Sequence, residues 1–213
     1  MVGAWWVWLV AAGLYALFRC GYDNWRGPLT PAEIDAFMAE AAHTRLNDHS
    51  DPAVVRAFLE ADDGKEFVMS NLVRVHPGEV AHPLTGVPTP GMLLLQAYAR
   101  RFVSLLLRHG GHPLIAMRKV GGYVDAWNTA PDPGWHVVSA MRYRSRRDLM
   151  ALALNPALRE VHLLKTASTE ATFSFPAQVM FSFALRPRVW VALLLALMAA
   201  LLHLASLLLL LAR

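Results

Sequence analysis

The chain has 213 residues, of which 55% are hydrophobic and only 17% are charged, so part of it is expected to lie in lipid. The formal net charge is +4, and several basic residues flank apolar segments, so nucleic-acid binding is not needed to explain the charge. The single cysteine, Cys20, excludes an intramolecular disulfide and suits a reducing compartment.

Two apolar segments account for this composition. Residues 2–18 carry no charge and would span roughly 25 Å as a helix. Residues 189–212 form a longer run that only His203 and Ser206 interrupt. The first segment lacks a basic start and a small-residue cleavage site, which favours an uncleaved anchor over a signal peptide. The sequence therefore predicts two transmembrane helices, with His203 hydrogen-bonded between them.

Arginines next to these segments predict the orientation. Arg19 and Arg26 follow the first span, and Arg186 and Arg188 precede the second. Because cytoplasmic flanks are enriched in basic residues, the central domain is expected in the cytoplasm, with both termini outside.

A helical lead-in is predicted at residues 30–62. Thr30 and Glu33 have capping-box spacing around Pro31, and Asp51 with Pro52 starts a second short helix. The two helices either lie on the membrane surface or pack as a hairpin on the domain that follows.

Strands and helices then alternate over residues 65–183. Strands are expected at residues 66–75, 114–124, 135–143 and 171–183, and helices at 92–109, 146–155 and 157–167. Residues 76–91 contain four prolines and are predicted to be a loop. The order βαββαβ is typical of an α+β, ferredoxin-like domain, whose four-stranded antiparallel sheet has helices on one face. An uncovered apolar sheet face is costly, so we expect a homodimer.

The stretches NLVRV, AYARR, HGGHPL and GWHVVSAMRYRSRRDLMALALNP resemble the dimeric α+β barrel superfamily, which includes antibiotic-type monooxygenases. They are most similar to a small, poorly characterised bacterial family that carries N-L-x-R, W-x-x-V-x-x-x-x-Y-x-S-R and a following N/D-P. The resemblance covers roughly residues 66–183. It implies the fold and a bacterial source but no particular reaction. The flanking spans depart from the usual free-standing dimer.

Asn71, Trp127 and His136 are the catalytic candidates. They are the residue types with which cofactor-independent or haem-dependent oxygenases hold and polarise a substrate. The alternative is a sheet with a few satisfied polar groups near its ends. No cofactor is assigned.

A second candidate set is basic and could bind a ligand or a lipid headgroup. It comprises Arg74, Arg142, Arg144, Arg146 and Arg147. Two of these arginines lie in the first turn of a helix that begins at Ser145, where they oppose the helix dipole. Pairing with Asp148 or another carboxylate is therefore the competing interpretation.

Histidines in loops raise the question of a metal site. They are His76 and His82 around Glu79, and His109 and His112. Neither spacing matches a known ligand motif, so no metal is assigned.

These observations predict a dimeric accessory or binding module at the inner surface of the bacterial cytoplasmic membrane. Its partners would be membrane lipid and a membrane protein, not nucleic acid. The alternative is a monooxygenase-like enzyme that acts on a hydrophobic substrate in the barrel cavity.

Overall fold

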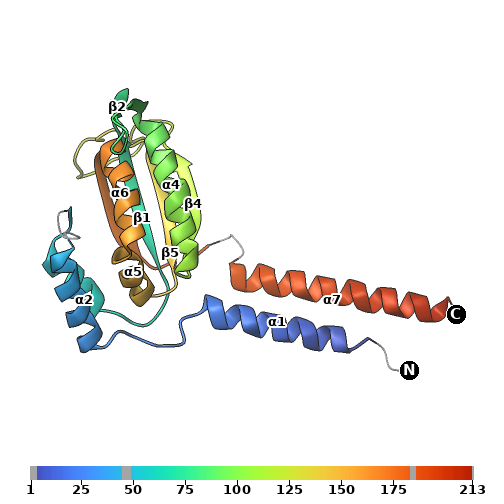
Figure 1. Cartoon of the computed structure of the whole chain (residues 1–213). Coiled ribbons are helices and arrows are strands. Elements are labelled where there is room, and N and C mark those ends of the chain that lie inside the picture. Colours follow the sequence, from blue (N-terminus) through green and yellow to red (C-terminus); the bar gives the residue numbers. More distant parts are fainter. Residues whose placement is uncertain (1–3, 45–48, 183–185, 213) are drawn as a thin grey trace. The chain divides into compact units, whose positions relative to one another are not determined.

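The computed structural model describes residues 4–44, 49–182 and 186–212, and the chain forms two compact units (Figure 1). The first combines residues 1–25 with residues 179–213, and the second is Arg26–Gln178. The predicted domain ends at residues 2 and 183 lie outside the described residues. The helical lead-in and the sheet belong to the same unit.

The first unit is a pair of helices, α1 (Trp6–Tyr22) and α7 (Pro187–Leu211). With 25 residues, α7 is long and apolar enough to cross a membrane. Helix α1 has 17 residues and is too short to qualify by the same measure. In the described part of the chain there is thus one candidate span, and the two-pass topology stays a prediction.

Polar side chains join α1 to α7. The Trp8 indole N–H donates to His203 Nδ1 at 3.1 Å, which confirms the predicted hydrogen bond between the helices. The Ser206 hydroxyl donates to the His203 carbonyl within α7. Toward the other ends of the helices, Arg188 Nε lies 2.7 Å from the Asp23 carboxylate. These polar groups of the apolar pair therefore have partners within the pair.

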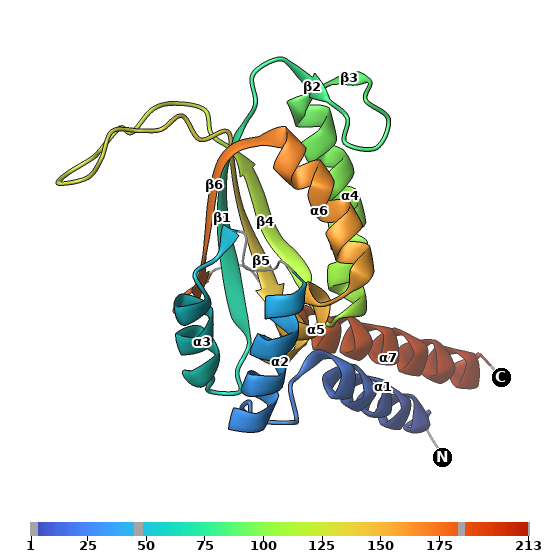
Figure 2. The ribbon, with the colours of Figure 1, turned by 60° about the vertical axis from the view of Figure 1, so that its left-hand side comes forward.

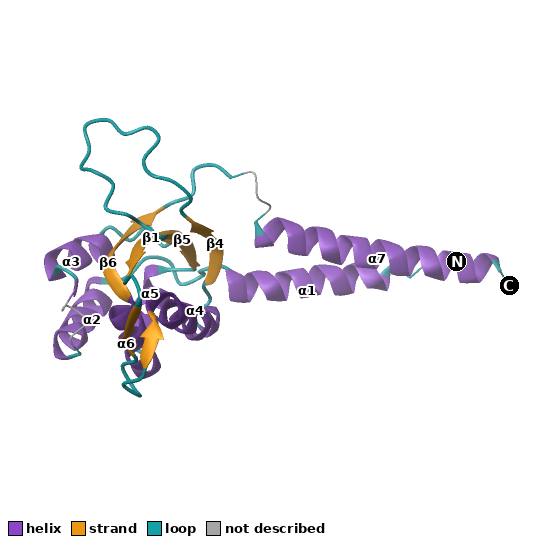
Figure 3. Cartoon of the chain, turned by 90° about the horizontal axis from the view of Figure 1, so that it is seen from above, coloured by secondary structure: helices purple, strands orange, loops and turns teal. Residues whose placement is uncertain are grey.

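The second unit is built on a four-stranded antiparallel sheet with strand order β4-β5-β1-β6. The strands are β1 (Phe67–Val75), β4 (His112–Arg118), β5 (Val137–Tyr143) and β6 (Thr169–Ala177). Helices α4 (Gly91–Arg108), α5 (Arg146–Ala153) and α6 (Pro156–Ser168) complete the predicted βαββαβ order. Helices α4 and α6 cover one face of the sheet (Figure 3). The ferredoxin-like topology is confirmed. Pro176 lies on edge strand β6, where a proline is tolerated.

Three local expectations were wrong. The strand predicted at residues 171–183 is shorter, because β6 ends at Ala177. The segment 76–91 contains a two-stranded ribbon of β2 (Glu79–Ala81) and β3 (Pro88–Pro90), whose strands are too short to show an alternating pattern. Strand β4 ends at Arg118, and a loop extends from there to residue 136 and projects from the sheet (Figure 2). An ion pair between Lys119 and Asp132 closes the base of this loop.

The lead-in consists of α2 (Pro31–His43) and α3 (Pro52–Glu60). The Thr30–Glu33 capping box is present, and the Asp51 side chain caps α3. Ile34, Phe37 and Leu59 form a buried cluster with Met150 of α5. The two helices thus pack as a hairpin on the sheet domain, which burial of these side chains stabilises.

The turn from α4 into β4 needs glycine. A Cβ on Gly111 would lie 2.7 Å from the Arg142 carbonyl oxygen of β5. The missing side chain therefore lets β4 start directly against β5.

Candidate functional site

A cavity of about 180 Å³ lies between the sheet and helices α4 and α6. Its apolar lining comes from both layers: Val73, Leu95, Ala99, Phe102, Val103, Val137 and Met141. Its polar lining consists of Asn71, Tyr98, Ser139, Tyr143 and Lys165. A mostly apolar cavity with a few polar groups is the usual form of a small-molecule site.

The alternation of β1 and β5 places side chains in this cavity. Asn71 and Val73 share one face of β1, and Val137, Ser139 and Met141 share one face of β5. Asn71 lies opposite Ser139 in the antiparallel register. These residues therefore share the sheet face that helices α4 and α6 cover, not the bare face.

The polar side chains of the cavity include one hydrogen-bonded amide, two phenols and one ammonium group. The Asn71 amide donates to the Met69 carbonyl at 3.0 Å and accepts from the Ser174 hydroxyl at 2.7 Å. Burial raises the pKa of the Tyr98 and Tyr143 hydroxyls, so both remain neutral phenols. Burial lowers the pKa of the Lys165 ammonium.

The three catalytic candidates are not brought together. Asn71 lines the cavity, but Trp127 lies in the projecting loop and is 85% exposed. His136 is exposed just before β5, where its Nδ1 accepts a hydrogen bond from the Val75 N–H at 2.9 Å. Its ring therefore fastens the start of β5 to the end of β1, outside the cavity lining.

Each arginine of the run RYRSRR has a carboxylate partner within the same unit. Arg142 is 2% exposed and binds Glu66 at 2.8 Å. Arg144 binds Asp148 at 2.5 Å. Burial alone would raise the pKa of Asp148, but hydrogen bonds from Arg144 and Ser145 outweigh it and hold this pKa below its usual value.

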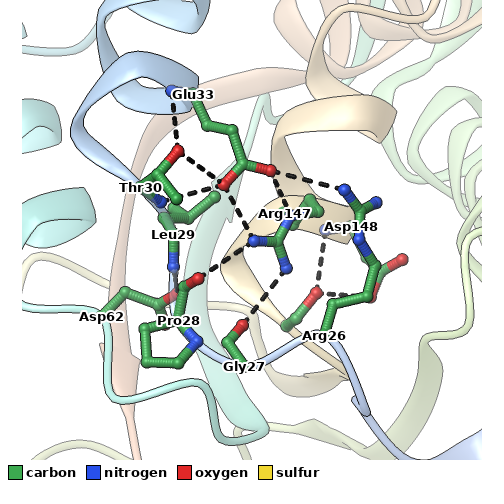
Figure 4. Close-up of polar contacts among 10 residues, drawn as sticks. Arg26, Gly27, Pro28, Leu29, Thr30, Glu33, Asp62, Arg147 and Asp148 are labelled. Atoms are coloured by element: carbon green, nitrogen blue, oxygen red, sulfur yellow. Dashed lines mark hydrogen bonds and ion pairs between the residues drawn. The ribbon is translucent and has the colours of Figure 1, made fainter.

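The last two arginines of the run reach the lead-in. Arg146 lies 3.3 Å from the Asp62 carboxylate, and its guanidinium stacks over the Phe58 ring at 4.4 Å. Arg147 binds Glu33 at 2.7 Å and donates to the carbonyls of Gly27 and Pro28 (Figure 4).

Arg74, the remaining basic candidate, pairs with Glu170 of β6 and donates to the Pro133 carbonyl at 2.9 Å. A lipid headgroup at any of the five arginines would have to compete with an internal carboxylate. These contacts agree with the pairing interpretation, and lipid binding stays a prediction.

The loop histidines make local contacts. His109 Nδ1 lies 2.8 Å from the Leu105 carbonyl, and His82 Nδ1 accepts from the Leu84 N–H. Across residues 4–44, 49–182 and 186–212, no three His, Cys, Asp or Glu side chains are grouped so that they could hold a metal ion.

Lys165 and Tyr98 are site residues that sequence reasoning missed. Lys165 follows Leu164 on α6, at positions that share a helix face with Val161 and Ser168. This i, i+3, i+4, i+7 spacing is typical of the buried face of a helix. A lysine at one of these positions was therefore the feature of the sequence that could have pointed to Lys165.

Other hollows lie in the same unit, and two of them adjoin the sheet. One of about 400 Å³ is lined by α2, α3, α5 and the sheet, and its charged lining residue, Asp51, caps α3. The other, about 600 Å³, is an open groove along α6 and β6 that contains Lys165 and several hydroxyl groups. The small cavity remains the best candidate because it lies inside the domain and contains Asn71.

Comparison with known protein families and with curated proteins finds no match. Among solved structures, a protein of unknown function from Rhodopseudomonas palustris, RPA0582, is 22% identical, with a TM-score of 0.51 over 61% of this chain and 94% of that one. The methylated RPA0582 protein gives 22% identity and a TM-score of 0.53 over 64% and 98%. A putative antibiotic biosynthesis monooxygenase from Bacteroides thetaiotaomicron is 10% identical, with a TM-score of 0.36 over 57% and 96%. The first two comparisons show a shared fold and nothing about activity.

Glu33→Gln tests the contact between the lead-in and the arginine run. Hydrogen bonds from Arg147, and next from the Thr30 N–H, lower the pKa of Glu33 from 4.5 to about 2. Because the folded-state pKa is depressed, the stabilisation is complete above pH 4.5 and is lost as the pH falls toward 2. In the full-length protein, the variant should lower the unfolding free energy by about 1 kcal/mol at pH 7 and flatten its dependence on pH in this window.

Urea unfolding followed by far-ultraviolet circular dichroism measures both effects. Glu40→Gln, on the exposed side of the same helix, should behave like the wild type. A Glu33→Gln curve parallel to that of the wild type between pH 4.5 and 2 would show that the ion pair does not stabilise the fold.

Proposed function

We propose that the protein is a membrane-anchored, homodimeric binding module that holds a small, mainly apolar ligand in the cavity beneath α4 and α6. The observation that carries this proposal is the cavity itself, about 180 Å³ in volume. A cavity of about 150 Å³ in another protein accommodates benzene. The volume therefore suits a ligand with about one ring.

Binding is preferred to turnover because of how the candidate residues are distributed. Asn71 alone of the three catalytic candidates lines the cavity. The enzyme alternative rests on this amide, which could hold a substrate carbonyl or phenol. An accessory role, in which the domain presents its ligand to a membrane-protein partner, needs no further catalytic group.

Membrane anchoring is supported by α7 and by its pairing with α1. A helix of 25 residues spans roughly 37 Å, more than the hydrocarbon core. Helix α1, with 17 residues, would cross a somewhat thinned bilayer. The Trp8–His203 hydrogen bond removes part of the cost of placing both side chains in lipid. The arginine flanks favour a cytoplasmic domain at the bacterial inner membrane.

A homodimer is supported by the sheet face opposite α4 and α6. Cross-strand pairing gathers apolar side chains there: Leu72, Ile115, Met117, Val138, Phe173 and Phe175. Phe173 and Phe175 stack with ring centroids 6.0 Å apart, and each is 46% exposed. A second copy of the same face would bury these rings at about 25 cal/mol per Å².

Fusions to alkaline phosphatase test the topology in a bacterial host. Alkaline phosphatase is active only outside the cytoplasm. A fusion after Arg213 should therefore be active, whereas a fusion after Gln178 should be inactive. Activity after Gln178 would mean that the central domain is exported, and would overturn the cytoplasmic assignment.

Phe175→Glu tests the dimer. A carboxylate on the apolar sheet face, here on edge strand β6, should convert the dimer to a monomer, because the charge would have to be buried without a partner. Native mass spectrometry of the protein released from mild detergent gives the oligomeric state. Leu163→Glu, at an exposed position of α6, is the matched control. A wild-type monomer, or a dimeric Phe175→Glu variant, would contradict the proposed interface.

Ala99→Phe tests the cavity. The larger side chain should fill the space and reduce binding of the neutral ligand 4-fluorobenzamide by at least about tenfold. Fluorine NMR line broadening on full-length protein in lipid nanodiscs measures this binding, with empty nanodiscs as the blank. Gln96→Phe, on the exposed side of α4, should bind like the wild type. Benzamide binding that Ala99→Phe leaves unchanged would contradict a ligand site in this cavity.

A further inference from the structure

One charged group faces the cavity. Among the described residues that line it, only Lys165 carries a charge. The side chain extends from the buried stripe of α6, between Leu164 and Ser168, both of which are at most 2% exposed. An ammonium group in such surroundings is costly unless an anion or a hydrogen-bond acceptor approaches it.

No described residue supplies an anion to this lysine. Within residues 4–44, 49–182 and 186–212, no carboxylate lies within ion-pair distance of Lys165. Its Nζ lies 6.0 Å from the centre of the Tyr98 ring, a weak contact. The arginines of the RYRSRR run, on the same domain, all have carboxylate partners. The two other lysines, Lys65 and Lys119, also have carboxylate partners, so Lys165 differs from both.

The groups around Lys165 do not change its role as the cation of the site. Tyr98 and Tyr143 are neutral phenols, because burial raises the pKa of both. Burial, and then Lys165 and His49, lower the pKa of His162 to about 4, so its imidazole is neutral at pH 7. The carboxylate of Glu170, in the adjoining groove, is paired with Arg74.

Lys165 also marks where the cavity meets the open groove. It lines both spaces, the apolar cavity on one side and the hydroxyl-bearing groove between α6 and β6 on the other. A molecule with an apolar ring and one anionic group matches this change from an apolar lining to a hydroxyl-bearing one. The ring would occupy the cavity, and the anionic group would lie at the lysine, within reach of water in the groove.

We infer that the ligand of this module is a small aromatic monoanion, such as a carboxylate, whose charged group is held by Lys165. This inference rests on the proposed ligand-binding function and adds the chemical class of the ligand. The cavity would select against neutral isosteres, because they would leave the ammonium unpaired beside an apolar surface.

The experiment compares two fluorinated ligands of nearly equal shape, 4-fluorobenzoate and 4-fluorobenzamide. Fluorine NMR titrations use the full-length protein in zwitterionic lipid nanodiscs at pH 7. The wild type should bind the benzoate at least about tenfold more tightly than the benzamide. Lys165→Met, which keeps the unbranched apolar body of the side chain and removes the ammonium group, should abolish this preference while retaining benzamide binding. Lys165→Arg should restore part of it.

Lys65→Met is the control, because it removes the same charge from an exposed position and should leave the preference unchanged. The comparison of the two ligands on the wild type needs no variant, so it stands even if Lys165→Met does not fold. Equal affinity of the wild type for both ligands, with binding still sensitive to Ala99→Phe, would overturn the inference and leave the proposed function intact. If neither ligand binds the wild type, both are refuted.

Discussion

The ion pairs between the arginine run at residues 142–147 and the carboxylates around it hold the sheet domain together. Arg142 joins the end of β5 to Glu66 at the start of β1, and Arg147 joins α5 to Glu33 of the lead-in. Removing one partner of a buried pair leaves an uncompensated charge, which typically costs about 3–5 kcal/mol. The cost is largest at Arg142, which is 2% exposed. The run therefore links β1, β5, α5 and the lead-in at one place.

With these elements joined, the two faces of the sheet take different roles. The face that carries Asn71 and Ser139 is covered by α4 and α6 and contains the cavity. The opposite face presents Phe173 and Phe175 to solvent. Because successive side chains of a strand point to opposite faces, neighbouring residues lie in these two different environments. One strand can therefore line a ligand site and also supply an interface to a second copy.

Local signals predicted much of this architecture because they act over a few residues. The capping box at Thr30 and the N-cap at Ser145 fix helix starts through hydrogen bonds three residues apart. The βαββαβ order followed from periodicity, and the hydrogen bond between the apolar helices at His203 followed from the cost of a polar group in lipid. The ribbon of β2 and β3 was missed because three-residue strands leave no pattern.

The amino-acid sequence by itself determined the apolar helices, the order of the elements and which residues share each strand face. Only the tertiary structure decided the composition of the candidate site. Asn71 remained in it, whereas Trp127 and His136, both outside the strands that line the cavity, did not. Lys165 entered it because α6 packs against the sheet with that side chain inward. Which helix face meets a cavity, and which carboxylate reaches each arginine, depends on contacts between residues far apart in the sequence, such as Glu33 and Arg147, 114 positions apart. No local pattern encodes such contacts, because they form only when the layers pack together.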